Sequence, residues 1–201
     1  MTTRNTLRRD LRARRRVLDS VTRAQAAESL AALLITLSCY QSSRHLAAYV
    51  AVDGELNPEP LLRYAYRDGK QIYLPVVPAT RTAALRFHPW EPGMRMRPNR
   101  IGIPEPETTD SVGIAPQDLD LVLTPLVAFD SAGHRLGMGG GFYDRTFAFL
   151  KVGANKPLLL GLAYEFQRLE HIDEASWDVP LTGVITERGT YITKASDRER
   201  T

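Results

Sequence analysis

The sequence predicts an α/β fold, in one three-layer, Rossmann-like domain whose mostly parallel sheet is flanked by helices. Short apolar segments typical of buried strands alternate with segments of helical periodicity. Strand 45–50, a helix from Asn57 to Gly69 and strand 71–77 follow each other closely enough to form a βαβ unit, which implies parallel strands. At 201 residues, the chain is long enough for one sizeable core, so we expect a single domain over residues 1–193 and a polar tail at 194–201.

Composition narrows the class of protein. The chain is 43% hydrophobic and 24% charged, which is typical of a globular protein, and its apolar runs stop short of the roughly 18 residues that a membrane span needs. We therefore expect a cytoplasmic monomer without membrane contact. The single cysteine, Cys39, cannot form an internal disulfide. A net charge of +3 fits a small anionic ligand and is a weak signal for nucleic acid, so no nucleic-acid partner is expected.

The amino-terminal segment is predicted to be an arginine-rich helix over residues 3–18. Residues 4–16 include seven arginines and one acidic residue, and the leucines keep helical spacing. Arg4, Arg8 and Arg12 then line one side of the helix, where they could fold over a polyanionic ligand. A solvated helix face, a nucleic-acid arm or a membrane-surface helix would share this pattern.

The remaining elements follow in order. A second helix is expected from Thr22 to about Ser38, opened by a capping box of Thr22 and Gln25. Further strands are expected at 83–88, 118–125, 157–163 and 183–187, and a helix at 142–151. Segment 126–130 would continue its strand into a glycine loop. Residues 88–117 are proline-rich and aperiodic, and we interpret them as an ordered loop packed over a pocket, with Trp90 either stacking on a flat ring or filling a minor cluster.

The chemistry concentrates in the stretch from His134 to Arg145. Four of the five residues at 137–141 are glycine, so the backbone can adopt positive φ angles and expose amide groups to an anion. Arg135 adds a permanent cation, and Asp144 adds a carboxylate that could hold a metal ion bound to phosphate. A glycine-rich turn with surface charges is the plain alternative.

A second group of candidates follows the first predicted strand. Asp53, Gly54 and Glu55 fall where ligands collect in parallel α/β sheets, beyond the carboxyl end of a strand. Glu55 is placed to accept hydrogen bonds from substrate N–H groups, although a surface-loop acid would look the same. The position of Asp178, before Pro180, does not define its role.

These segments resemble the 5-formyltetrahydrofolate cyclo-ligase (methenyltetrahydrofolate synthetase) family. The resemblance begins in the arginine helix and extends to about Gly189. Six blocks match in order: Val52-Asp-Gly-Glu-Leu56, Tyr73-Leu-Pro-Val76, Gly102-Ile-Pro-Glu-Pro106, Thr124-Pro-Leu-Val-Ala-Phe-Asp130, Arg135-Leu-Gly-Met-Gly-Gly-Gly-Phe-Tyr-Asp144 and Trp177-Asp-Val-Pro-Leu181. Six ordered blocks are far more specific than one glycine loop. The alternatives are a phosphate-binding isomerase or transferase of the same fold group, and a non-catalytic basic binding module.

The resemblance implies an ATP- and Mg²⁺-dependent closure of 5-formyltetrahydrofolate, with or without a polyglutamate tail, to 5,10-methenyltetrahydrofolate with release of ADP and phosphate. The formyl oxygen is a poor leaving group, so it is first phosphorylated, and the neighbouring N10 then attacks the activated carbon. In such phosphoryl transfers the protein mainly supplies positioning and charge neutralisation.

The resemblance also implies site residues. The ATP contacts are expected at Arg4, Asn5, Thr6, Leu7, Arg8, Arg135, Leu136, Gly137, Met138, Gly139, Gly140, Gly141, Phe142 and Tyr143. The folate contacts are expected at Val50, Glu55, Met138, Gly139, Gly140, Gly141 and Phe142, with Trp90 and Tyr143 as candidate walls. Asp144 and Asp178 would hold Mg²⁺, and Arg135 and Tyr143 are the expected catalytic residues. Many relatives carry a lysine where this chain has Gly140, so either the arginines act without it or another residue replaces it.

Overall fold

The computed structural model describes residues 3–80, 82–107 and 113–193, so the expected tail at 194–201 lies outside the described part. Its centre is a seven-stranded sheet with the order β11-β10-β9-β6-β1-β2-β3. These strands are β1 (His45–Ala47), β2 (Gln71–Val76), β3 (Arg86–Trp90), β6 (Leu121–Pro125), β9 (Leu158–Leu162), β10 (Gly183–Ile185) and β11 (Thr190–Ile192). The five inner strands are parallel, and the edge strands β3 and β11 are antiparallel. The predicted α/β class with a mostly parallel sheet is confirmed.

The other elements surround this sheet. The α-helices are α1 (Arg4–Arg16), α2 (Ser20–Leu34), α3 (Ser38–Ser42), α4 (Glu59–Arg67) and α5 (Phe142–Thr146). Short 3-10 helices are η1 (Pro116–Asp118), η2 (Ala148–Val152) and η3 (Glu165–Gln167). Two small antiparallel hairpins pair β4 (Met96–Pro98) with β5 (Pro104–Pro106) and β7 (Ala128–Phe129) with β8 (Arg135–Leu136).

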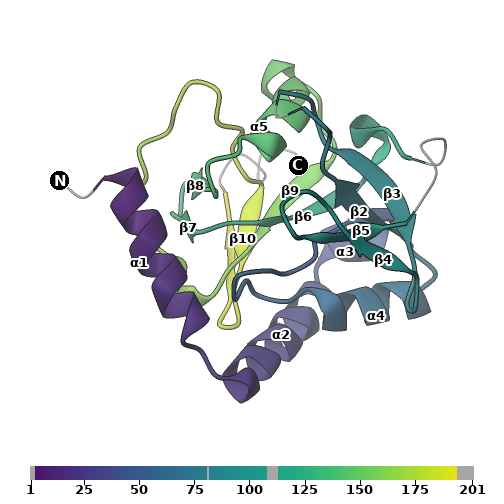
Figure 1. Ribbon diagram of the computed structural model, residues 1–201, viewed down its shortest axis with the longest axis horizontal. Helices are drawn as coiled ribbons and strands as arrows, with labels where there is room; N and C mark the ends of the chain where they lie inside the picture. The colour runs from purple at the N-terminus through teal and green to yellow at the C-terminus, as the bar shows by residue number, and fades with distance from the viewer. Residues whose placement is uncertain (1–2, 81, 108–112, 194–201) are drawn as a thin grey trace.

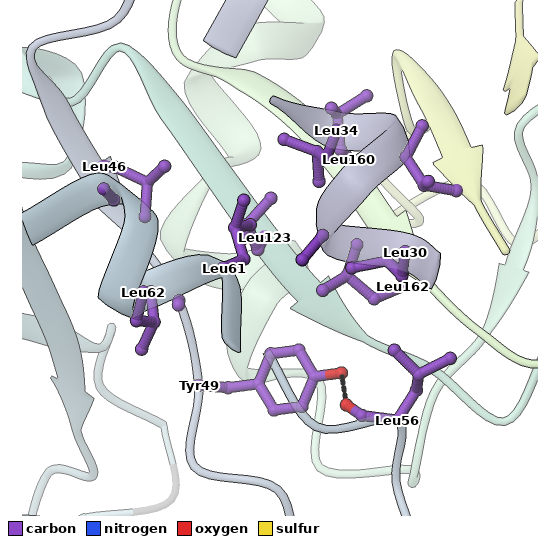
Figure 2. Close-up of a cluster of buried hydrophobic side chains, with 14 of the residues drawn as sticks. Leu30, Leu34, Leu46, Tyr49, Leu56, Leu61, Leu62, Leu123, Leu160 and Leu162 are labelled. Carbon is purple, nitrogen blue, oxygen red and sulfur yellow. Dashed lines mark hydrogen bonds between the residues drawn. The ribbon is translucent and has the colours of Figure 1, made fainter. Parts of the chain in front are cut away.

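The sheet is buried on both faces. Successive side chains of a strand point to opposite faces, so neighbouring residues enter different clusters. Leu46 and Leu123 pack with leucines of α2 and α4 on one face, as Figure 2 shows, whereas Ala47 and Val122 pack with Phe147 on the other. Helices α2 and α4 lie on the opposite side of the sheet from α5 (Figure 1). Each buried leucine contributes about 1.5–3 kcal/mol, so burial on both faces accounts for the near-continuous apolar strands.

The first two helices begin at capped residues. Thr3 precedes α1, and its hydroxyl accepts a hydrogen bond from the Thr6 backbone N–H at 3.2 Å. Asp19 caps α2, since its carboxylate accepts from both the backbone N–H and the hydroxyl of Thr22. The predicted capping box of Thr22 and Gln25 was therefore wrong: Thr22 is the donor to the cap. The predicted helix to Ser38 was also too long, because α2 ends at Leu34 and α3 begins separately.

Two strand predictions and one loop prediction require correction. The strand expected at 83–88 corresponds to β3, which starts only at Arg86. It pairs with β2 in the antiparallel direction and forms one edge of the sheet. Segment 126–130 does not continue β6, because β7 turns away to form a hairpin with β8. Residues 88–117 are not a plain loop, since they hold the β4–β5 hairpin; residues 108–112 lie outside the described part.

The ends of two other elements also differ. The helix expected at 142–151 is broken into α5 and η2 at Phe147, whose φ of −107° and ψ of 17° depart from helical geometry. The last predicted strand, 183–187, stops at Ile185 and is followed by β11, which was not expected. Within the described residues, none of the helices is both long and apolar enough to cross a membrane.

Candidate active site

The candidate site lies where the strand order of the sheet reverses. Strands β1 and β6 are parallel neighbours, but the chain moves from β1 to β2 on one side and from β6 to β9 on the other. Connections that diverge in this way leave a crevice at the carboxyl ends of the two strands. Residues 48–55 follow β1, and the β7–β8 hairpin and the glycine loop at 137–141 follow β6. Topology thus brings together the two groups of candidates that are far apart in sequence.

Glu55 is held in a buried position below this crevice. Glu55 is only 8% exposed, and its Oε2 accepts a hydrogen bond from the Val52 N–H at 3.1 Å. The Arg15 Nη2 lies 3.8 Å from Oε1. Burial raises the pKa of Glu55, and the Val52 hydrogen bond and the Arg15 charge offset this rise only in part. A desolvated acceptor of this kind discriminates strongly in favour of a ligand that donates hydrogen bonds to it.

A cavity of about 990 Å³ opens beside Glu55. Its lining includes Val50, Glu55 and Trp90, three of the predicted substrate contacts. Met96 and Pro104 of the β4–β5 hairpin also line it, so segment 88–117 does cover a pocket, as predicted. Its size is at the upper end for small-molecule sites, and its lining mixes apolar and charged groups. Neither the glycine loop nor the α1 arginines are among its lining residues in the described part of the chain.

Helix α1 is anchored to the connection that follows β1. The Asp53 carboxylate accepts hydrogen bonds from Arg12 Nε at 2.6 Å and Arg15 Nη2 at 3.1 Å, and it also pairs with Arg16. Burial alone would raise the pKa of Asp53, but the hydrogen bonds from Arg12 and Arg16 outweigh burial and lower it. Asp53 has a φ of +54°, and it precedes Gly54, whose φ is +74°. The tight turn therefore presents one carboxylate to three guanidinium groups.

The other arginines of the same helix face reach the glycine loop. Arg8 Nε donates to the carbonyl of Gly137 at 2.8 Å, and Arg4 pairs with Asp178 at 3.3 Å. A Cβ at Gly139, whose φ is +96°, would lie 3.8 Å from the Arg8 guanidinium carbon, so the side chain crosses directly over the loop. The predicted alignment of Arg4, Arg8 and Arg12 on one side of the helix is confirmed by these contacts.

Positive charge is concentrated over the loop. Burial and the charge of Arg4 lower the pKa of Arg8, although Asp178 acts in the opposite direction. The Nε of Arg4 is buried and has no hydrogen-bond partner among the described residues. Helix α5 has only five residues and begins after Gly141, so a helix dipole adds little here. The arginines and the amides of the loop are therefore the groups that could hold an anion.

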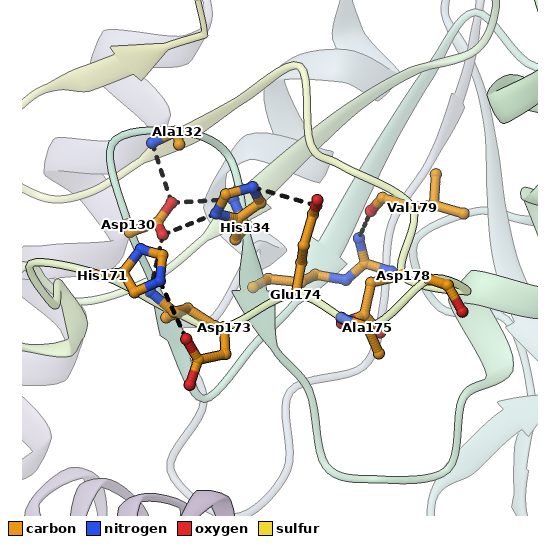
Figure 3. Close-up of polar contacts among 12 residues, drawn as sticks. Asp130, Ala132, His134, His171, Asp173, Glu174, Ala175, Asp178 and Val179 are labelled. Carbon is orange, nitrogen blue, oxygen red and sulfur yellow. Dashed lines mark hydrogen bonds and ion pairs between the residues drawn. The ribbon is translucent and has the colours of Figure 1, made fainter.

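The two predicted metal ligands lie on either side of one peptide segment. Asp144 Oδ1 accepts from Arg135 Nη2 at 2.6 Å and from the Val179 N–H at 3.2 Å, and Arg135 Nη1 also donates to the Val179 carbonyl. Asp178, which Figure 3 shows beside Val179, uses Oδ2 to accept from Arg4 and from the Ala175 N–H. Asp178 closes a turn that begins at Ala175, whose carbonyl accepts from the Asp178 N–H at 2.9 Å. Arg135 is only 8% exposed, and both of its terminal guanidinium nitrogens are engaged by Asp144 and Val179.

The other predicted contacts have varied settings. Asn5 accepts from Arg8 Nη1 at 2.9 Å, the Thr6 hydroxyl faces that of Thr3, and Leu7 packs on a small apolar cluster. Leu136 is buried in β8, and Met138 is 46% exposed. Tyr143 stacks on Phe147, and burial, together with the Glu55 charge, raises the pKa of its hydroxyl.

Comparison with known proteins identifies the family. The profile of the 5-formyltetrahydrofolate cyclo-ligase family matches residues 1–187. A 5-formyltetrahydrofolate cyclo-ligase of Haemophilus influenzae is 36% identical over 90% of this chain and 96% of its own length. One from Escherichia coli strain K12 is 35% identical over 88% of this chain and 96% of its own. The chain belongs to the 5-formyltetrahydrofolate cyclo-ligase family.

A solved structure agrees with this membership. The 5,10-methenyltetrahydrofolate synthetase of Aquifex aeolicus superposes with a TM-score of 0.80 at 28% identity, covering 95% of this chain and 93% of the other. The resemblance stated from the sequence blocks is thereby confirmed, and so is the extent of the family match along the chain. The cyclo-ligase family is a family of ligases, which sets the kind of chemistry to be expected of the site.

Within this cyclo-ligase fold, a cation lies next to Gly140. Arg145 Nη2 donates to the Gly140 carbonyl at 2.9 Å, and its guanidinium carbon lies 5.2 Å from the centre of the Phe142 ring. A Cβ at Gly140 would lie 3.0 Å from the Phe142 ring, and a Cβ at Gly141 would lie 2.7 Å from Arg145 Nη1. The Phe142 ring thus occupies the space that a side chain at Gly140, the missing lysine position, would need, and Arg145 occupies the space beside Gly141.

Two anchoring residues were not assigned roles from the sequence. Arg15 is 1% exposed and reaches Asp53, Glu55 and the Leu126 carbonyl, which lie after both central strands. Its helical spacing from Leu7 and Leu11 placed it near the apolar face, which is the signal that could have marked it as buried. Asp53 carried a weaker signal, namely an acidic residue before a glycine in a turn.

Proposed function

We propose that the protein catalyses the ATP- and Mg²⁺-dependent cyclisation of 5-formyltetrahydrofolate to 5,10-methenyltetrahydrofolate, with release of ADP and phosphate. It would act as a cytoplasmic monomer with a single domain, 1–193, of the three-layer Rossmann-like class found in CoA transferases and sugar-phosphate isomerases. The observation that carries the proposal is the placement of the Glu55-lined cavity and the arginine-covered glycine loop after two neighbouring parallel strands, β1 and β6. Family membership supports it.

The cavity side would bind the folate. Glu55 would accept hydrogen bonds from pterin N–H groups through Oε1, since Oε2 accepts from Val52. Val50 and Trp90 would supply apolar walls for the ring. Residues Met138, Gly139, Gly140, Gly141 and Phe142 would close the site from the loop side. The pairing of β1 with β6, the strands that these two sides follow, supports a short separation between them.

Arg23 is suited to the glutamate part of the folate. It lines the cavity at the amino-terminal end of α2, and its Nε is buried without a hydrogen-bond partner among the described residues. Its Nη2 donates to the Arg16 carbonyl at 2.8 Å, which fixes the side chain. A carboxylate is the natural partner for an oriented guanidinium, so we infer that Arg23 binds a glutamate carboxylate.

The loop side would bind ATP. Arg4 and Arg8 would contact the polyphosphate, and the buried, unpartnered Nε of Arg4 fits this role. The positive charges of Arg4 and Arg8 repel each other, so a polyanion between them would relieve this repulsion. Residues 5–7 of α1 and the backbone from Arg135 to Tyr143 would complete the nucleotide contacts.

Asp144 and Asp178 would hold Mg²⁺. Each carboxylate uses one oxygen in the contacts described above, Oδ1 in Asp144 and Oδ2 in Asp178, and the other oxygen has no partner among the described residues. Two carboxylate oxygens and nucleotide phosphates are ligands that Mg²⁺ prefers. When bound, the ion supplies positive charge to the transferring phosphoryl group.

The chemistry then needs two steps in one enclosed site. The formyl oxygen attacks the γ-phosphorus and ADP leaves; N10 next attacks the formyl carbon, loses its proton, and the carbon–oxygen bond breaks to release phosphate. Arg135 would orient Asp144 through their ion pair, and Tyr143 would hold the formyl group close to N10 and exclude water. Both act by positioning, which is where an intramolecular attack gains most of its rate.

Arg145 would take the place of the missing loop lysine. Its guanidinium lies over the Gly140 carbonyl and Phe142, at the part of the loop where the transferring phosphoryl group would lie. A cation there would stabilise the charge that develops in the transition state.

The direct test is an absorbance assay. Purified protein with Mg²⁺, ATP and 5-formyltetrahydrofolate should accumulate the near-ultraviolet absorbance of the methenyl product, and omission of ATP should abolish the signal. Absence of product with Mg²⁺, Mn²⁺ and Co²⁺ alike would contradict the proposal. Tight, steeply salt-dependent RNA or DNA binding that survives Arg135→Ala would instead favour a basic binding module.

A further inference from the structure

We propose that Asp130, His134 and His171 form a binding site for one divalent transition-metal ion, and that Zn²⁺ is the ion best suited to it. The site is built from the β7–β8 hairpin and the segment after η3. It shares no residue with the candidate Mg²⁺ ligands, Asp144 and Asp178. The proposal does not depend on the proposed reaction.

The three side chains converge on one point. One ligand atom from each of Asp130, His134 and His171 lies within 4.8 Å of the others. Asp130 Oδ2 and His134 Nδ1 are 2.9 Å apart, and the two imidazole rings are perpendicular, with centres 6.4 Å apart. Figure 3 shows both rings beside the Asp130 carboxylate. Ligands about 2.0–2.2 Å from Zn²⁺ in a tetrahedron are roughly 3.3–3.6 Å apart, so small side-chain rotations suffice.

Each histidine is oriented by a carboxylate on the far side of its ring. His134 Nε2 lies 3.2 Å from Glu174 Oε2, and His171 Nε2 lies 3.1 Å from Asp173 Oδ1. This leaves Nδ1 of each ring for the ion. Metal-binding histidines commonly donate their other ring N–H to a carboxylate, which fixes the ring and makes it a better ligand. Asp173 and Glu174 are 96% and 60% exposed, so it is the buried Asp130 carboxylate that distinguishes the cluster from a chance group of surface charges.

Asp130 provides a rigid and buried anchor. It is 2% exposed, and its carboxylate accepts hydrogen bonds from the backbone N–H groups of Ala132, His134 and Ile172 at 3.0–3.1 Å. An ion would replace only the hydrogen bond between Asp130 and His134. The His171 side chain is 70% exposed, so the ion can enter from solvent and retain a water as a fourth ligand.

The ligand types determine the class of ion. Two imidazoles and one carboxylate suit Zn²⁺ and neighbouring transition metals, whereas Mg²⁺ prefers an all-oxygen octahedral shell. A bound ion would connect the hairpin that precedes the glycine loop with the segment that leads to Asp178. The expected role is to fix these two segments relative to each other.

The test is titration calorimetry of the tag-free, chelator-treated full chain with Zn²⁺, without ATP or Mg²⁺. We expect saturable binding of one ion and a raised Tm. His134→Ala and His171→Ala should abolish this binding, and Asp173→Ala and Glu174→Ala should weaken it on the order of ten- to a hundredfold. His45→Ala, which removes a histidine that also lies near a carboxylate, Asp120, and Asp144→Asn should bind as the wild type does.

Bound Co²⁺ gives a second readout, because a tetrahedral Co²⁺ ion with histidine ligands absorbs strongly in the visible range. His171→Ala should remove this absorption. That side chain is largely exposed, so this variant should fold, which circular dichroism can verify. Absence of saturable Zn²⁺ binding to the wild type would overturn the proposal. So would full Zn²⁺ binding by His171→Ala, or equal loss of binding in His45→Ala.

Discussion

Arg15 and Asp53 join the first helix to the end of the first central strand. The Arg15 side chain is 1% exposed, and its Nε donates to the Asp53 carbonyl at 2.9 Å while Nη2 donates to the carboxylate at 3.1 Å. Arg15 Nη1 also donates to the Leu126 carbonyl, just after β6, at 3.2 Å. One buried cation therefore connects α1 with the connections that follow both strands of the switch point.

Replacing this cation should cost substantial stability. Arg15→Met leaves the Asp53 carboxylate and two backbone carbonyls with fewer donors in a buried setting, and we expect a loss of about 3–5 kcal/mol in the free energy of unfolding. Arg9→Met is the matched control, because Arg9 pairs with Asp10 on the exposed side of the same helix and should lose less than about 1 kcal/mol. Urea titration of both variants measures the difference; equal losses would contradict the anchoring role.

Glu55→Gln should stabilise the fold while it weakens the use of folate. The pKa of Glu55 is raised in the folded state, so its contribution to stability falls as pH rises between its unfolded and folded pKa values. The Tm of the variant should therefore exceed that of the wild type at neutral pH, by about 2–4 °C for each kcal/mol recovered. This difference should shrink as pH falls and the wild-type carboxyl becomes protonated. A Tm difference that grows as the pH falls would contradict a raised pKa of Glu55 in the folded state.

Arg145→Ala should mainly slow the chemical step. If Arg145 stabilises charge on the transferring phosphoryl group, its loss should lower kcat on the order of a hundredfold, with a smaller change in the KM for ATP. Arg145→Lys should recover part of the rate, because a cation remains. Arg44→Ala, at the opposite end of the central strands, is the control and should be close to wild type. An unchanged kcat in Arg145→Ala would contradict the proposal that Arg145 takes the place of the loop lysine.

Arg23→Gln should raise the KM for 5-formyltetrahydrofolate and leave the KM for ATP nearly unchanged. Loss of one charge-assisted hydrogen bond of about 1.5 kcal/mol corresponds to a roughly tenfold weaker ligand. Arg67→Gln on α4 serves as the control, because Arg67 does not line the cavity. Steady-state kinetics with each substrate varied in turn decides the matter, and a parallel rise in both KM values would point to general damage.

The fold was largely predictable because the spacing of apolar residues along the sequence reflects which side chains are buried. The strands now numbered β2, β6 and β9 appear in the sequence as compact apolar runs, since both of their faces are covered. Element ends were less predictable. Asp19 and Thr22 both have cap-forming side chains, and only the three-dimensional contact shows which one accepts the hydrogen bond. Strand β11 was missed because a three-residue edge strand has too few residues to show alternation.

The site was predictable in its composition but less so in its internal pairing. Glu55 and the glycine loop each follow a strand of a mostly parallel sheet, so they could be expected on the same edge of it, whereas the pairing of β1 with β6 was not predicted. Which arginines face the loop and which anchor the helix could not be read from spacing alone. Arg12 and Arg8 lie on one helix face, yet Arg12 pairs with Asp53 and Arg8 crosses the loop. That division depends on where the helix lies along the sheet edge.

The cap of α1 at Thr3 has a practical consequence for work with this protein. Arg4 follows immediately and pairs with Asp178, so the start of the described chain lies beside the proposed nucleotide side of the site. A purification tag added before Met1 would be joined two residues before Thr3, and we expect it to compete with ATP for Arg4 and Arg8. Affinity measurements for nucleotide therefore need protein whose amino-terminal extension has been removed.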